Sequence, residues 1–417
     1  MTAVTDEDGK VNRQLDQGQQ EEPLGQFFMF DSSSDKQEWL LVCPSGHHIR
    51  LGQLAYEVLS KRWSGLEFES ISSDFEASRC IQVAPDEIAH YFAQLTDKIK
   101  TITARAPQSD QNFKLRLTIF SSEAVRIATR PLLILYSKAY SLTLLVILVL
   151  SLFAWFGTRW SMHEPAWSIT SVAIAYLIYV ATLIFHELGH ASATAYFGES
   201  PGPIGFTLYM IFPALYSNVT PSWKLKRWQR VVVDIGGEYF QMLALAPILW
   251  VDMLVKWPPA HIAAIMVMAT SIFNLNPFFK FDGYWILSDA LGVHNLMDRA
   301  RVILGSIVTK NQERVGYPKA IIFALVAYAV VSTGALLYII VSVAIELFLS
   351  AGSFLSAVEP DIRDGKLPPV SFFVHEGGSM ILAVVASYFL LNMLTQLTKS
   401  LSSSISARRS TRSTVTK

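Results

Sequence analysis

The residues with the clearest chemical potential form the run HELGH at positions 186–190. Residues four apart on a helix project from one face, so the imidazoles of His186 and His190 would lie one turn above the other. Two neutral imidazoles placed in this way can share one zinc ion. The glutamate between them, Glu187, can then take a proton from zinc-bound water. The run predicts a hydrolytic zinc site with Glu187 as its base.

A catalytic zinc ion usually has three protein ligands and one open position. Asp282, in the sequence FNLNPFFKFDGYW, is the best candidate for the third ligand. Pro277 should interrupt the helix before it, because proline lacks an N–H donor and clashes with the preceding turn. Asp282 would then lie at the cytosolic end of its span, at the same depth as the two histidines. The alternative is that Asp282 and Gly283 only form a turn at a helix end.

The HELGH run follows an apolar stretch at 168–185 that carries no charge. Each ionisable side chain at bilayer depth costs about 2.5–3.5 kcal/mol on insertion scales. Three such groups together need a compensating partner, and a metal ion is the simplest one. The alternative is that the helix has already left the membrane and that these side chains lie among lipid headgroups.

The composition is that of a membrane protein, since 51% of the 417 residues are hydrophobic and 16% are charged. Soluble domains carry about 25% charged residues. Lys+Arg and Asp+Glu balance at 34 each, which gives no support for a nucleic-acid partner. Two cysteines, Cys43 and Cys80, are too few for a disulfide framework and indicate a reducing compartment. The sequence CPSGHH that begins at Cys43 is expected to be a turn.

Long apolar runs predict about six transmembrane helices, each needing about 20 residues. Basic residues gather in the loops on one side, which the positive-inside rule makes cytosolic together with both termini. The expected fold is therefore an α-helical polytopic protein of the cell membrane, with a small cytosolic α+β domain before it. The runs lie at about 139–157, 168–185, 229–254, 261–281, 320–345 and 377–398.

The polar N-terminus lacks the apolar core of a secretory signal, and residues 1–23 are expected to be a disordered lead. The short runs FFMFD and WLLVC predict strands, and helical periodicity follows them. The predicted domains are the lead, a small cytosolic domain at 24–104, a juxtamembrane amphipathic segment at 105–138, a membrane core at 139–291, a cytosolic loop at 292–317, two further spans within 318–398 and a basic cytosolic tail at 399–417.

HELGH together with N-x-x-P-x-x-x-x-D-G, at 274–283, resembles the site-two-protease family of intramembrane zinc metallopeptidases. The resemblance covers roughly residues 130–290. It implies that His186, His190 and Asp282 bind zinc, that Glu187 is the general base and that Asn274 helps to hold substrate. The sequences FPALYSNVTPSW and NPFFKFDGYW are similar to a bacterial branch, the peptide zinc metalloproteases, which accompany machinery for ribosomally made, modified peptides.

This resemblance implies a metalloendopeptidase that removes a leader from a precursor peptide or matures it. The implied partners are a peptide or membrane-protein substrate, the lipid bilayer, and other enzymes or an exporter of a modified-peptide pathway. The domain at 24–104 resembles the small winged-helix domains that bind leader peptides, and a structural cap on the protease is the alternative. A second hypothesis is regulated cleavage of a signalling membrane protein. A third is a peptide exporter or immunity protein that binds zinc without hydrolysis, against which the intact Glu187 argues.

The third predicted span departs from the family pattern. The family usually has a Gly-x-x-x-Asn-like element there, whereas this chain has Gly237 and Gln241. Asp234 and Glu238 share a helix face in the same span. We expect them to pair with Arg230 or to line a polar groove, and we do not include them in the metal site.

Overall fold

The computed structural model describes residues 23–33, 37–79, 82–104, 113–159, 168–209, 212–308 and 316–363. The chain divides into two compact units, 1–323 and 324–417, which are described separately. The predicted lead up to residue 22, the predicted span at 377–398 and the predicted basic tail lie outside the described residues.

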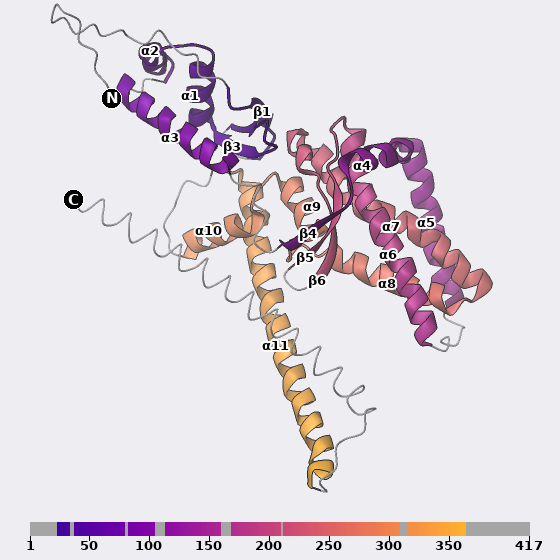
Figure 1. Cartoon of the computed structure of the whole chain (residues 1–417). Coiled ribbons are helices and arrows are strands. Elements are labelled where there is room, and N and C mark those ends of the chain that lie inside the picture. Colours follow the sequence, from indigo (N-terminus) through magenta and orange to yellow (C-terminus); the bar gives the residue numbers. More distant parts are fainter. Residues whose placement is uncertain are drawn as a thin grey trace, which may run out of the picture. The chain divides into compact units, whose positions relative to one another are not determined.

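The N-terminal domain is a three-stranded antiparallel sheet followed by three helices (Figure 1). The strands are β1 (Gln26–Phe30), β2 (Glu38–Val42) and β3 (His48–Gly52), in that order across the sheet, and the helices are α1 (Gln53–Trp63), α2 (Phe68–Arg79) and α3 (Pro85–Ala104). Both predicted strands are present. A core that includes Leu41, Leu59, Ile71 and Phe92 joins the sheet to the helices. The winged-helix likeness of this domain stays a prediction.

The segment after Cys43 is the expected turn. The backbone N–H of Cys43 donates to the carbonyl of His47 over 2.9 Å, and that of Gly46 donates to the carbonyl of Cys43. Gly46 has a φ of 81°, a conformation that costs a glycine little. The turn connects β2 to β3, and the Cys43 thiol is buried and unpaired.

The described part of the predicted juxtamembrane segment forms a strand, a short helix and a 3₁₀ turn. These are β4 (Phe113–Phe120), α4 (Ser122–Thr129) and η1 (Arg130–Tyr136). The strand pairs antiparallel with β5 (Ile204–Tyr209), which pairs in turn with β6 (Phe212–Ser217). Residues on both sides of the HELGH helix in sequence therefore build one sheet, in the order β4-β5-β6.

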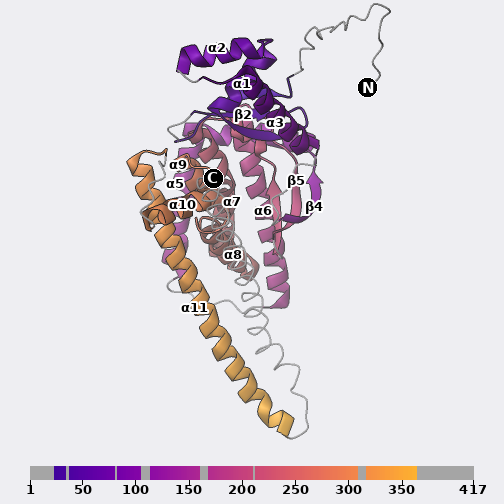
Figure 2. The same ribbon diagram turned by 90° about the vertical axis from the view of Figure 1, so that its left-hand side faces the viewer.

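Three helices within the described residues are long and apolar enough to cross a membrane. Figures 1 and 2 show them side by side with the shorter α8. Large apolar side chains such as Phe153 and Leu150 are exposed on their outer surface, as expected for contact with lipid tails. The four helices are α5 (Lys138–Arg159), α6 (Ile169–Tyr196), α7 (Arg227–Val255) and α8 (Pro258–Asn274).

The count of six spans stays a prediction. At 17 residues, α8 is shorter than the about 20 that a span needs. The fifth predicted span lies within α11 (Lys319–Arg363), a single helix of 45 residues that belongs mostly to the second unit (Figure 2). The helix also includes residues 350–363, where a loop outside the membrane was expected.

The connecting elements of the first unit are η2 (Thr220–Lys224), α9 (Asp282–Leu291) and α10 (Leu296–Val308).

The helices α6 and α7 cross at Gly189 and Gly236. A Cβ atom on Gly189 would overlap the carbonyl of Gly236, and one on Gly236 would lie 2.8 Å from the carbonyl oxygen of Gly189. Small residues let two helix backbones approach in this way. The hydroxyl of Tyr136 donates to the Gly189 carbonyl over 2.8 Å at the same crossing. The crossing brings the middle of α7 against the histidines of α6.

The predicted helix break before Asp282 is present, although the helix ends earlier than expected. The last residue of α8 is Asn274, and α9 starts at Asp282 after a turn that contains Pro277. A Cβ atom on Gly283 would overlap the backbone of Leu275. Glycine is therefore required at 283 because the start of α9 lies directly against the end of α8. Asp282 is the first residue of a new helix rather than the end of the fourth span.

Candidate metal centre

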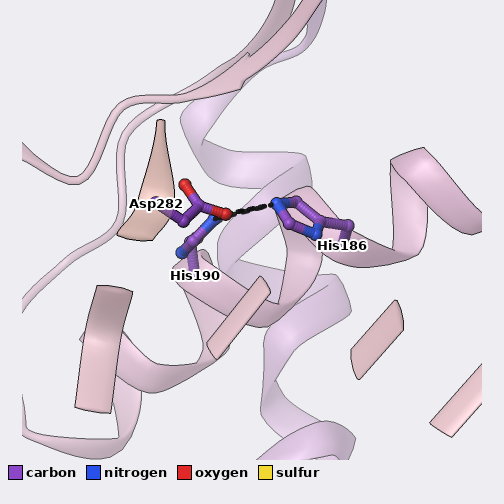
Figure 3. A group of neighbouring side chains, drawn as sticks. All are labelled: His186, His190 and Asp282. Atoms are coloured by element: carbon purple, nitrogen blue, oxygen red, sulfur yellow. Dashed lines mark hydrogen bonds and ion pairs between the residues drawn. The ribbon is translucent and has the colours of Figure 1, made fainter. Parts of the chain in front are cut away.

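Three side chains on α6 and α9 bring potential metal ligands together, and Figure 3 shows them pointing toward one another. The Nε2 atoms of His186 and His190 lie 3.2 Å apart. The Oδ2 atom of Asp282 lies 3.0 Å from the first and 3.5 Å from the second. Ligands about 2.0–2.2 Å from a tetrahedral zinc ion lie about 3.3–3.6 Å from each other. The three separations of 3.0, 3.2 and 3.5 Å are close to this range, so the triangle fits one zinc ion after small shifts of the side chains.

The other ring nitrogens fix both imidazoles in the form that binds metal. His186 Nδ1 lies 2.9 Å from Gln241 Oε1, and His190 Nδ1 lies 2.8 Å from the carbonyl oxygen of Val233. The carbonyl oxygen is only an acceptor, and the amide oxygen likewise accepts, so each Nδ1 carries the proton. Each Nε2 then keeps its lone pair directed at the shared position, as metal-ligating histidines generally do.

The backbone of α7 forms the wall behind the two imidazoles. A Cβ atom on Gly237 would overlap Nε2 of both His186 and His190. Only glycine leaves room at the point where the two ligand atoms converge. Together with the aspartate and the two imidazoles, this open space fits a small cation.

Glu187 is buried on α6 between the two histidines, with 9% of its surface exposed. Its carboxylate lies against the backbone of Ser217, at the end of β6. The sheet therefore approaches the metal centre on the side of the predicted base.

Gln241, which the sequence marks only as a departure from the family pattern, contacts His186. It is fully buried on α7. Its place four residues after Gly237 was noticed in the sequence, but the histidine it would contact could only be found from the crossing of α6 and α7. Asn274, the predicted substrate-binding residue, lies in the last turn of α8 beside Glu238.

Arg230 pairs with an acid that the sequence did not single out. Its Nε atom donates to Asp289 Oδ1 of α9 over 2.9 Å, and its Nη2 atom donates to the carbonyl of Asp31 over 2.9 Å. Asp234 is linked to Arg230 indirectly, since it lies beside Asp289. The other acid of α7, Glu238, lies with its Oε1 atom 3.9 Å from His186 Nδ1. The expected pairing with Arg230 is therefore wrong for Glu238, which adjoins the metal centre.

A comparison with known proteins supports a metalloprotease. Over 123 residues the chain is 27% identical to the "Putative peptide zinc metalloprotease protein YydH" of Bacillus subtilis (strain 168). The match covers 29% of this chain and 48% of that protein, so the chain spans about half the length of this relative. No model of a protein family matches the chain, and no solved structure matches it. The similarity supports zinc and peptide hydrolysis, and it leaves the substrate open.

Proposed function

We propose that this protein is a zinc-dependent endopeptidase of the cell membrane that cleaves a precursor peptide or a membrane-associated substrate. One observation carries the proposal: His186, His190 and Asp282 form a triangle close to the size that zinc requires, next to the carboxylate of Glu187. A structural zinc site would have no use for that carboxylate, since such sites are closed by four protein ligands.

A zinc ion held by the three ligands would supply Lewis acidity, which polarises a peptide carbonyl and lowers the pKa of a water molecule to about 7. Glu187 takes the proton of the attacking water on its carboxylate and delivers it to the leaving amine. Gln241 and the carbonyl of Val233 hold the two imidazoles in place while this happens. The amide of Asn274 is proposed to hold the substrate near the reacting bond.

The substrate is proposed to enter as an extended strand, because a helical segment keeps its carbonyls in internal hydrogen bonds. The strand order places β6 at one edge of the described sheet, and the end of β6 lies against Glu187. An extended peptide could add to such an edge through its main chain. The edge would then bring a peptide bond toward the base.

We further propose that the N-terminal domain recognises a leader peptide and that the role of the protein is leader removal or peptide maturation. Its sheet ends in β1 and β3, either of which offers an edge for an added strand. Partners in such a pathway would be modifying enzymes or an exporter, with both termini of this protein in the cytosol. Cleavage of a signalling membrane protein remains the second candidate for the same chemistry.

The proposed activity can be tested on peptides that are not chosen in advance. The zinc-loaded protein in detergent is incubated with a mixture of proteome-derived peptides, and new termini are identified by mass spectrometry. We expect new termini that disappear after chelation and return when zinc is added. The same termini with and without chelator would show that a contaminating peptidase acts and would contradict the proposal.

A further inference from the structure

Glu238 is a buried carboxylate beside the metal centre that the proposed mechanism does not use. It is 4% exposed, and its Oε1 atom lies 3.9 Å from His186 Nδ1. Ser271 and Asn274 of the last turn of α8 lie next to it. Within the part of the chain that the structure describes, neither carboxylate oxygen has hydrogen-bond geometry to a donor. The side chain of Gln241 satisfies His186 Nδ1 instead.

The charges around the metal centre leave Glu238 without a counterion. The carboxylates of Asp282 and Glu187 together balance the two positive charges of a zinc ion. The nearest buried cation on α7, Arg230, is engaged by Asp289. A carboxylate at membrane depth is costly unless a partner neutralises it. A carboxylate that stays ionised at this position needs a cation, and the described groups around it are the hydroxyl of Ser271, the amide of Asn274 and the ring of His186.

We propose that Glu238 is a specificity site that binds a basic side chain of the substrate, arginine or lysine, at a residue flanking the scissile bond. The inference rests on the proposed function. A carboxylate whose described neighbours Ser271 and Asn274 are uncharged matches the paired N–H groups of a guanidinium, which binds carboxylates through two parallel hydrogen bonds. The hydroxyl of Ser271, which lies beside Glu238, supplies one more acceptor. The short distance to His186 keeps the bound residue next to the reacting bond.

The preference is measured first in the pattern of cleavage. Wild-type protein and the Glu238→Gln variant digest the same mixture of proteome-derived peptides, and the residues around each new terminus are compared. We expect arginine or lysine to be enriched at one fixed position with the wild type. The variant should lose this enrichment and still cleave. Asp234→Asn is the matched control, because Asp234 lies one turn away on the same face of α7 and beside Asp289, and it should keep the enrichment.

A double-mutant cycle then identifies the interaction. One cleaved peptide is synthesised with arginine or with citrulline, its neutral isostere, at the enriched position. Either the citrulline substitution or Glu238→Gln alone should lower kcat/KM by about 10- to 100-fold, as expected for loss of a charge-assisted contact. The two changes together should cost no more than one of them. Glu238→Asp, which keeps the charge, should retain part of the preference for arginine.

Each contrary result has a distinct meaning. Zinc-dependent cleavage without basic enrichment, or additive effects in the cycle, would overturn the inference and leave the proposed function intact. Loss of zinc from Glu238→Gln would also overturn it, because Glu238 would then support His186 rather than bind substrate. The absence of any zinc-dependent cleavage by the wild type would overturn the proposed function and this inference with it.

Discussion

At the scale of single residues, Gly237 cannot gain a side chain without disturbing the two histidine ligands. Replacement by alanine would push its methyl group into Nε2 of both His186 and His190. We expect Gly237→Ala to remove most of the bound zinc, as measured by metal analysis of the purified protein. Gly157→Ala is the matched control, since a Cβ atom on that helical glycine meets nothing within 4 Å. Full zinc content in Gly237→Ala would show that the imidazoles do not converge on this point.

Substitution of Gln241 tests independently whether the hydrogen bond to His186 Nδ1 strengthens zinc binding. Removal of a hydrogen-bond partner of a ligating histidine typically weakens metal binding by about 10- to 100-fold. We therefore expect Gln241→Leu to weaken zinc affinity by that factor, while Gln241→Glu keeps an acceptor for His186 Nδ1 and loses less. Competition with a chromogenic chelator measures both affinities. Equal zinc affinities for wild type and Gln241→Leu would show that Gln241 does not support the metal ligands.

The candidate site was largely predictable because two of its ligands are four residues apart on one helix. The spacing of His186 and His190 is enough to place them on one face. Asp282 was predicted from its expected depth and from the family resemblance, and the structure brings it to the two histidines. The need for glycine at 237 and the position of Glu238 beside His186 could not be predicted, because both depend on where α7 crosses α6. A crossing of this kind depends on contacts between residues about 47 positions apart, such as Gly189 and Gly236.

At the scale of elements, Arg230 ties the start of α7 to the end of α9. It is 2% exposed and holds Asp289 through a hydrogen-bonded ion pair. We expect Arg230→Met to lower the free energy of unfolding by about 3 kcal/mol, because it leaves a partly buried carboxylate without its cation. Arg126→Met removes an exposed ion pair with Glu123, which solvent screens, and should change the stability little. Thermal or denaturant unfolding in detergent compares the two, and equal losses would contradict the link.

Elements were predicted well where their pattern is local. The apolar runs identify α5, α6 and α7, and proline marks the break between α8 and α9. The strand β4 was expected as an amphipathic segment because its partner β5 lies about 90 residues later in the chain. A strand whose pairing is so distant has no nearby turn that would reveal it. The expected fourth span was also too long, because the helix ends at Asn274 before it reaches the proline.

At the scale of the whole molecule, the N-terminal domain contacts α7 and the end of α9 through the loop that follows β1, and β1 itself packs against η2. Asp31 Oδ2 accepts from the backbone N–H of Arg227 over 2.8 Å, and the backbone N–H of Ser33 donates to the carbonyl of Gly292 over 2.9 Å. The loop therefore joins the start of α7 to the end of α9. A role in substrate recognition and a role in stability are both compatible with these contacts.

Two deletions distinguish the contribution of this domain to stability from that of the segment before it. Deletion of residues 1–104 removes the contacts of Asp31 and Ser33, and we expect a Tm lower by several degrees in detergent. Deletion of residues 1–22 keeps these contacts and should leave the Tm unchanged. An unchanged Tm after the longer deletion would show that the loop does not hold α7 and α9 together.

The central claim is that Glu187 is the general base of a zinc-dependent hydrolysis and is not itself a zinc ligand. The most direct measurement compares zinc content and peptide cleavage in wild type and Glu187→Gln, which is nearly isosteric. We predict one zinc ion per chain in both proteins, and cleavage lowered in the variant by about 10²- to 10⁴-fold, the usual contribution of a general base. Comparable turnover by the two zinc-loaded proteins would contradict the account.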